Sequence, residues 1–309
     1  MSKGSRIKSN RKVVPLSKKE LRKQKRKNRH YGITTPSYYF LKIIALACCF
    51  LWYFSYVFYK IVGLTETEFY ILQIFGVVAY PLTAYLCVES YYHTEHKGRH
   101  FLIMLAIAIL SEPLYDYVLF GKVFTTVYQN PVFSLAAGFV CLKISNINYT
   151  IFDKMYKKKR YCTIAKWGFR VCLMFGIGYL TNILHFEYSY YGIILMWCLS
   201  KARKARFTLI AQIISFAVYG CFTYDDAWLF ITVCGLAVLL AFFQWYARYD
   251  RQEKEHRKFI RTREIFGKVF SVSGKVISSK PVRIFTRFYY PAMLAGMSVA
   301  LYFVERRIV

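Results

Sequence analysis

The stretch that decides the fold is Phe101–Gly138, which reads FLIMLAIAILSEPLYDYVLFGKVFTTVYQNPVFSLAAG. Its apolar run from Phe101 to Leu110 is too long for a strand, and it leads into a hydrophobic segment that carries Glu112 and Asp116. Two carboxylates four residues apart share one face of a helix, and carboxylates at membrane depth are costly enough to predict a function. The alternative is that both acids form hydrogen bonds that hold helices together.

Composition excludes an ordinary soluble domain. The chain has 56% hydrophobic residues together with a formal net charge of +28. This combination is typical of a polytopic membrane protein whose charges are confined to loops. The nine cysteines nearly all fall in apolar runs, and no CxxC pair is present, so we expect small buried thiols rather than disulfides or a metal site.

Nine apolar segments predict an all-α bundle of about nine transmembrane helices. Most have the ~20 residues that a helix needs to cross the membrane. With the N-terminus in the cytoplasm, the inner segments hold 38 of the 44 Lys and Arg residues, as the positive-inside rule requires. The same rule needs the short sixth segment to cross and places the C-terminus outside. The segments are 38–61, 67–92, 100–120, 131–149, 161–184, 187–200, 206–223, 226–247 and 286–304.

Three regions follow along the chain. Residues 1–37 form a basic arm, expected to be disordered on the anionic inner leaflet, because residues 1–34 hold thirteen Lys or Arg and one acid. Aromatic residues that could stack on bases are absent before His30 and Tyr31, so we expect no nucleic-acid partner. Residues 38–304 form the transmembrane domain, with a basic amphipathic cytoplasmic loop at 248–287 that Lys280-Pro281 would interrupt or end. Residues 305–309 are a short tail.

Polar residues gather toward the outer ends of the segments. A carboxylate beside His185 would make a general acid–base pair, so we predict Glu112, Asp116 and His185 as catalytic residues. The alternative for Glu187, Asp225 and Asp226 is that they are solvated loop residues. The predicted outer cluster comprises Glu112, Asp116, Asn130, Asn182, His185, Glu187, Asp225 and Asp226.

Charged residues also occur toward the inner side, at Lys42, Glu89, Lys143 and Arg170. Glu89 would form a structural ion pair with Arg170 or Lys143. A cytoplasmic mouth lined with Lys and Arg would also attract a polyanionic donor such as a coenzyme A thioester, so Lys143 and Arg170 are the predicted cofactor-binding residues. The same positive charges also satisfy the topology rule.

Six blocks of sequence occur along the chain in a recognisable order. They are LKIIAL (41–46), FGVVAYPLTAYLCVESYYHT (75–94), LSEPLYD (110–116), QNPVFSLAAGF (129–139), EYSYYGIILM (187–196) and RFYYPAML (287–294). In this order the blocks resemble the TraX-type pilin acetylase family. The resemblance implies an integral protein of the bacterial inner membrane that moves an acetyl group from cytoplasmic acetyl-CoA, or another acyl-CoA, to an exported acceptor such as a pilin. It implies substrate-binding roles for the matching Glu89, His93, Ser111, Asn130 and Glu187.

Two departures from the family pattern bear on activity. The family's first helix carries an Asp-His pair where this chain has Trp52 and Tyr53, and its last helix carries a His where this chain has Met293. An imidazole titrates near neutral pH, whereas these three side chains do not. Three functions therefore stay open: an acyltransferase with a rearranged site, a catalytically silent relative that binds a membrane or assembly partner, and a transporter that uses its intramembrane carboxylates.

Overall fold

The computed structural model describes residues 35–147, 149–155, 159–202, 208–223, 227, 229–239 and 280–308, and all of them belong to the compact unit Ile33–Val309. Several predictions fall outside these residues. They are the basic arm over residues 1–34, the acids Asp225 and Asp226, and most of the basic loop 248–287.

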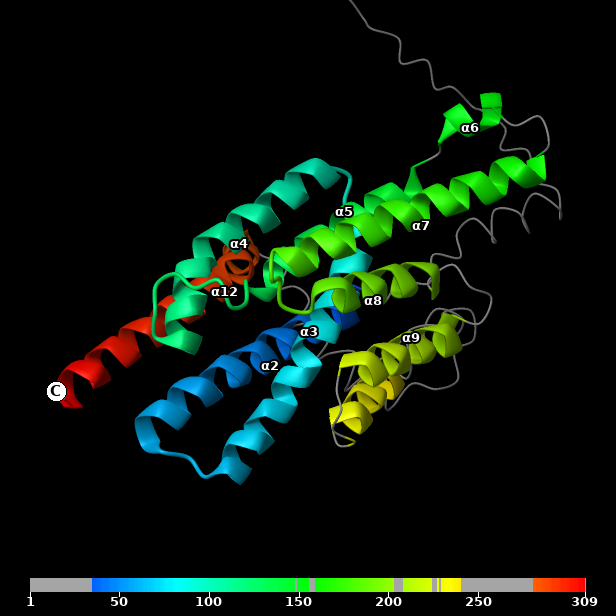
Figure 1. Ribbon diagram of the computed structural model, residues 1–309. Coiled ribbons are helices and arrows are strands. Elements are labelled where there is room, and N and C mark those ends of the chain that lie inside the picture. The colour runs from blue at the N-terminus through cyan, green and yellow to red at the C-terminus, as the bar shows by residue number, and fades with distance from the viewer. Residues whose placement is uncertain are drawn as a thin grey trace, which may run out of the picture. The chain divides into compact units, whose positions relative to one another are not determined.

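The described residues form helices, and no strand occurs among them (Figure 1). The all-α prediction is confirmed, and each of the nine apolar segments overlaps a helix. The helices are α2 (Thr35–Val62), α3 (Glu66–His93), α4 (Lys97–Phe120), α5 (Pro131–Asn146), α6 (Thr150–Met155), α7 (Lys159–Ile183), α8 (Ser189–Ala202), α9 (Thr208–Thr223), Leu229–Leu239 and α12 (Lys280–Ile308).

Fewer helices are suited to cross a membrane than the sequence predicts. In the described part of the chain, four spans are long and apolar enough: Leu41–Val62, Glu66–His93, Lys97–Phe120 and Pro131–Asp153. α8 has only 14 residues, and the first half of α7 carries four Lys or Arg residues, so neither joins this set. The four spans still identify a membrane protein.

The helix ends follow from local sequence signals. Thr65 and Glu68 form a capping box at the start of α3, in which each side chain bonds the other residue's backbone N–H. α4 ends at Gly121, whose φ of 69° suits glycine. α5 opens with Asn130 as its N-cap and Pro131 in the first turn, where a missing N–H costs nothing.

The Lys280-Pro281 step was expected to interrupt or end a helix in the basic loop, and the part of that loop before residue 280 lies outside the described residues. α12 begins at Lys280, six residues before the predicted segment 286–304. Proline is tolerated in the first helical turn because the N–H that it lacks has no intrahelical partner there.

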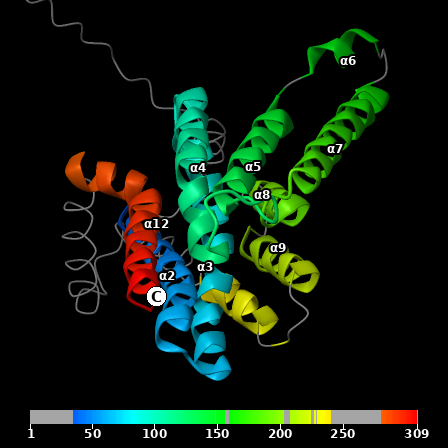
Figure 2. The same cartoon turned by 60° about the vertical axis from the view of Figure 1, so that its left-hand side comes forward.

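Two clusters of buried side chains pack the helices. α3 contacts α2, α5 and α8, and the first cluster is built around it from residues such as Leu82, Leu142 and Met196. The second cluster joins α2, α4 and α12, which lie side by side in Figure 2, through residues that include Tyr53 and Tyr115. These two clusters meet at α2, which therefore carries side chains into both.

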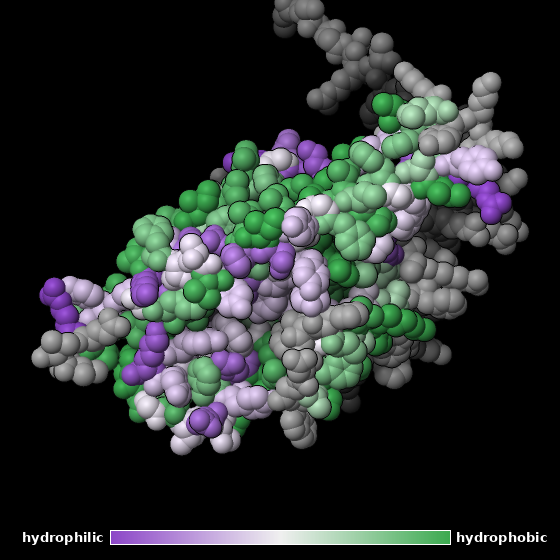
Figure 3. Space-filling view, in the orientation of Figure 1, coloured by the Kyte–Doolittle hydropathy of each residue, from purple (hydrophilic) through white to green (hydrophobic). Residues whose placement is uncertain are grey.

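Large apolar side chains are also exposed. On α4, Leu102, Ile109 and Leu110 each expose more than half of their surface. Hydrophobic residues cover much of the face over α4 and α7 in Figure 3. An apolar surface of this kind is unfavourable in water but suits the hydrocarbon core of a bilayer.

Candidate functional site

Asn130 joins the start of α5 to α4. Its side-chain amide donates to the Ala108 carbonyl oxygen at 2.9 Å, to Ser111 Oγ at 3.1 Å and to Glu112 Oε2 at 2.8 Å. Its backbone N–H also donates to Glu112 Oε2, at 3.1 Å, and its Oδ1 accepts from the Val132 N–H at 2.9 Å. The structure thus brings the predicted Ser111, Glu112 and Asn130 together, in the interhelical network that was the alternative to a catalytic role.

Asp116 holds the loop that follows α4. Only 1% of its surface is exposed, and its Oδ2 accepts a 2.7 Å hydrogen bond from the Thr125 N–H. Its Oδ1 is buried and has no hydrogen-bond partner among the described residues. Asp116 therefore fixes the path of the chain between Gly121 and Asn130.

Glu187 lies in the turn between α7 and α8, next to α4 and α5. Its Oε2 accepts a 2.8 Å hydrogen bond from Tyr115 Oη, and its carbonyl oxygen accepts one from Ser134 Oγ. Its backbone N–H donates to the Gln129 carbonyl oxygen at 3.0 Å. Three hydrogen bonds, one to the carboxylate and two to the backbone, hold Glu187 in place, and burial raises the pKa of its side chain to about 7.

The backbone of this turn is strained. His185, Tyr188 and Ser189 have φ values of 53°, 63° and 29°, in a region that residues other than glycine seldom adopt. Strain of this kind persists where surrounding contacts impose it, and it clusters at functional sites. Here the bond from the Gln129 N–H to the His185 carbonyl oxygen, 2.9 Å long, helps to hold the turn.

A cavity of about 140 Å³ opens beside Glu187. It lies between α2, α3, α5, α12 and the turn, and we call it the Glu187 cavity. Tyr53 Oη and Tyr290 Oη lie 2.9 Å apart, and the Tyr80 and Tyr188 rings stack with centroids 3.9 Å apart. The residues that line it include Trp52, Tyr53, Tyr80, Glu187, Tyr188 and Tyr290.

Two of the three positions at which the chain departs from the family pattern line this cavity, and the third lies in the neighbouring cluster of buried side chains. Trp52 and Tyr53 line the cavity, and Met293, with 8% of its surface exposed, packs in the same cluster as Tyr53. The Tyr53 ring centroid lies 6.1 Å from that of Tyr115, which bonds Glu187. Sequence reasoning missed Tyr53, Tyr115 and Tyr290 as site residues, although each interrupts an apolar segment with a hydroxyl group.

His185 is placed differently from Glu187. Its side chain is exposed, and its carbonyl oxygen joins the turn to Gln129. Asn182, the next-to-last residue of α7, is exposed as well. The pairing of His185 with a carboxylate stays a prediction, and the cavity beside Glu187 is the better-defined centre.

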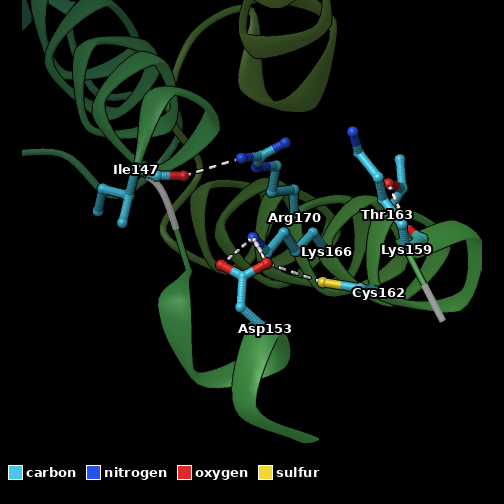
Figure 4. Close-up of polar contacts among 7 residues, drawn as sticks. All are labelled: Ile147, Asp153, Lys159, Cys162, Thr163, Lys166 and Arg170. Carbon is cyan, nitrogen blue, oxygen red and sulfur yellow. Dashed lines mark hydrogen bonds and ion pairs between the residues drawn. The ribbon is translucent and has the colours of Figure 1, made fainter. Parts of the chain in front are cut away.

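The inner charged residues lie near the far end of α5 from Asn130. Glu89 is 2% exposed, and its Oε2 lies 3.5 Å from His93 Nε2. Arg170 Nη2 donates to the Ile147 carbonyl oxygen at 2.8 Å, as Figure 4 shows. Lys143 is exposed in the last turn of α5.

Cations at this end stabilise α5. Arg170 and Lys143 both lie near its C-terminus, and Lys201 Nζ donates to Ser145 Oγ at 2.9 Å. A helix C-terminus carries a partial negative charge that positive side chains complement. The placement of these cations is thus explained without a cofactor, and coenzyme A binding by Lys143 and Arg170 stays a prediction.

Comparison with protein families gives a match over most of the chain. A family model described as TraX protein matches residues 37–297, which is well over half of the chain. No curated protein and no solved structure matches this chain.

Proposed function

This chain belongs to the TraX protein family, and from that premise we propose that it is an integral membrane acyltransferase. It would move an acyl group from cytoplasmic acyl-CoA to an exported peptide, pilin or envelope acceptor in the bacterial inner membrane. The observation that carries the proposal is the Glu187 cavity, where a carboxylate and two phenol hydroxyls lie beside the positions at which the family carries histidines.

Glu187 would act as the general base in place of the histidines that this chain lacks. A general base works best when its pKa lies near the working pH. With a pKa of about 7, Glu187 can accept the proton of an amine or hydroxyl acceptor and return it to the leaving thiolate. Tyr115, which donates to Glu187 Oε2, orients the carboxylate so that its other oxygen is directed to the acceptor.

Tyr53 and Tyr290 would stabilise negative charge. Two hydroxyls 2.9 Å apart at one cavity wall can both donate hydrogen bonds to one oxygen atom. Acyl-CoA, when bound, supplies a thioester carbonyl, whose oxygen gains negative charge during acyl transfer. Both residues line a mostly apolar cavity, and a hydroxyl that turns from its partner to the substrate oxygen would stabilise the developing charge in surroundings of low dielectric constant.

The volume of the cavity favours a short acyl group. Its 140 Å³ is close to the ~150 Å³ of an apolar cavity that holds one benzene molecule. An acetyl group with the reacting end of an acceptor fits this space, whereas a long acyl chain does not. Acetyl-CoA is therefore the proposed donor.

The test is acyl transfer by the purified protein in detergent, with acetyl-CoA labelled on its acetyl group. We expect release of the coenzyme A thiol to fall about 10²-fold or more in Glu187→Gln, and by a similar factor in Tyr53→Phe. Tyr302→Phe is the matched control, because Tyr302 lies on α12 with 44% of its surface exposed. Equal rates in all variants would refute the assignment of this cavity.

A second candidate is a catalytically silent relative that binds a membrane or assembly partner. It is favoured by Tyr53 and Met293, which stand where the family carries histidines. The same assay separates the two candidates. Labelled acetyl-CoA that neither binds nor releases thiol at saturating concentration would support the silent relative.

A further inference from the structure

A groove runs along the seam between α7 and α8, apart from the Glu187 cavity. Its volume is about 450 Å³, three times the ~150 Å³ that holds a benzene molecule. Buried Met174, Gly178 and Ile193 form its floor, and exposed side chains such as Phe175 and Ile194 form its walls. The lining is almost entirely apolar.

The helices approach closely enough to form this floor because of Gly178. A Cβ atom at this position would come within 3.2 Å of Tyr190 Cβ. A larger side chain would therefore push α8 away from α7. The groove therefore depends on the close approach of α7 and α8.

The two ends of the groove differ. At one end stands Trp197, whose ring packs edge-on against Trp167 with centroids 6.0 Å apart. Lys201 Nζ lies 5.2 Å from the Trp167 ring centroid and 5.6 Å from that of Trp197. At the other end stand Tyr179, Asn182 and Tyr190. Tryptophan beside an ammonium group is the arrangement found where a membrane protein meets the headgroup region.

The length of the groove matches one acyl chain. The groove follows α7 for twelve residues, from Val171 to Asn182, and the eleven steps between them at ~1.5 Å each span about 16 Å. The hydrocarbon core of a bilayer is ~30 Å thick, so one leaflet supplies about 15 Å of acyl chain. An apolar groove of this length matches one acyl chain, and the cation at its end matches an anionic headgroup, so the groove is complementary to an anionic phospholipid.

We propose that the groove between α7 and α8 binds one acyl chain of an anionic phospholipid, with its phosphate at the Trp197–Lys201 end. On the predicted topology this end faces the cytoplasm, so the lipid comes from the inner leaflet. The site does not depend on acyl transfer in the Glu187 cavity. It would hold α7 and α8 together, and neither of these helices is among the four apolar spans.

The test is native mass spectrometry of the purified protein titrated with phosphatidylglycerol and, separately, with phosphatidylcholine. We expect one retained phosphatidylglycerol per chain, and binding about tenfold weaker in Ile194→Trp, which fills the groove. Ile164→Trp is the matched control, because Ile164 lies on α7 outside the groove with 59% of its surface exposed. Lys201→Gln is expected to lower the preference for phosphatidylglycerol about fivefold, and Lys201→Arg to keep it.

A second measurement does not depend on folding of the variants. Phosphatidylglycerol with a photoreactive acyl chain is expected to label peptides of α7 and α8 between Val171 and Trp197 in the unaltered protein. Labelling confined to other helices would overturn the proposal, as would equal lipid retention in Ile194→Trp and Ile164→Trp. A dimer mass that Ile194→Trp abolishes would overturn it too, since a second copy would then occupy the groove.

Discussion

Replacing Asn130 with alanine should destabilise the protein more than any other single loss of a polar side chain between α4 and α5. The substitution removes the N-cap of α5, a loss of ~1 kcal/mol. It also removes three donor contacts to α4, and interhelical hydrogen bonds in membrane proteins average ~0.6 kcal/mol each. The partly buried Glu112 carboxylate loses one of its two donors from residue 130, because the backbone N–H remains, so the total loss of unfolding free energy should be about 2–4 kcal/mol.

Thermal unfolding in detergent measures this loss. Asn130→Ala should lower Tm by about 5 °C or more. Asn146→Ala is the matched control at the opposite end of α5, because Asn146 is exposed and its short hydrogen bond, 2.7 Å, is to the carbonyl oxygen of Leu142 in its own helix, with a longer 3.4 Å contact to Tyr92 Oη on α3. The control should change Tm by about 2 °C or less.

Asn130→Asp separates the contribution of the α5 N-cap from that of the hydrogen bonds to α4. Aspartate keeps an oxygen that can cap α5, but it cannot donate to Ala108, Ser111 or Glu112. We therefore expect Asn130→Asp to lose nearly as much stability as Asn130→Ala. If Asn130→Asp unfolds at the same temperature as the unaltered protein, the interhelical network does not stabilise the fold and the reasoning is refuted.

Three further predictions follow from single residues. The rate of acyl transfer should increase as pH rises through about 7, because Glu187 is a base only when it is ionised. Glu187→Gln should remove this pH dependence. A rate that falls over the same pH range in the unaltered protein would contradict the proposed role of Glu187. A Cβ atom at Gly76 would lie 1.5 Å from the Trp52 ring, so Gly76→Ala should lower the free energy of unfolding by about 1–3 kcal/mol, as measured by thermal unfolding. Gly98 has open space around it, so Gly98→Ala is the control and should leave the free energy of unfolding unchanged. Thr65→Ala removes the capping box of α3 and should lower the free energy of unfolding by about 1 kcal/mol, and an unchanged Tm would show that the cap adds nothing.

Helix positions could be predicted because they depend on local properties. The apolar runs placed the helices, and Asn130-Pro131 marks the start of α5 through a cap and a fixed φ that need no tertiary partner. The start of α12 was missed because Pro281 can either end a helix or open one, and the pattern around it fits both.

The candidate site could be predicted only in part. Glu112 and Asn130 were expected from their polarity in apolar surroundings and Ser111 from the family resemblance, and the three do lie together. The partnership of Tyr53 with Tyr290 joins residues 237 positions apart, and that of Tyr115 with Glu187 joins residues 72 apart. Tyrosine is common in membrane helices, so no single tyrosine indicates a site until packing brings its hydroxyl to a partner.

The sequence by itself determined that this protein is a helical membrane protein of the TraX family, because apolar length and family pattern are properties of the chain in order. Only the tertiary structure decided which polar groups meet. It joined Glu112 to Asn130 as an interhelical contact and set Glu187 beside Tyr53 and Tyr290 in a cavity. The physical reason is that a hydrogen bond acts over about 3 Å, and only helix packing brings residues that are distant in sequence within that range.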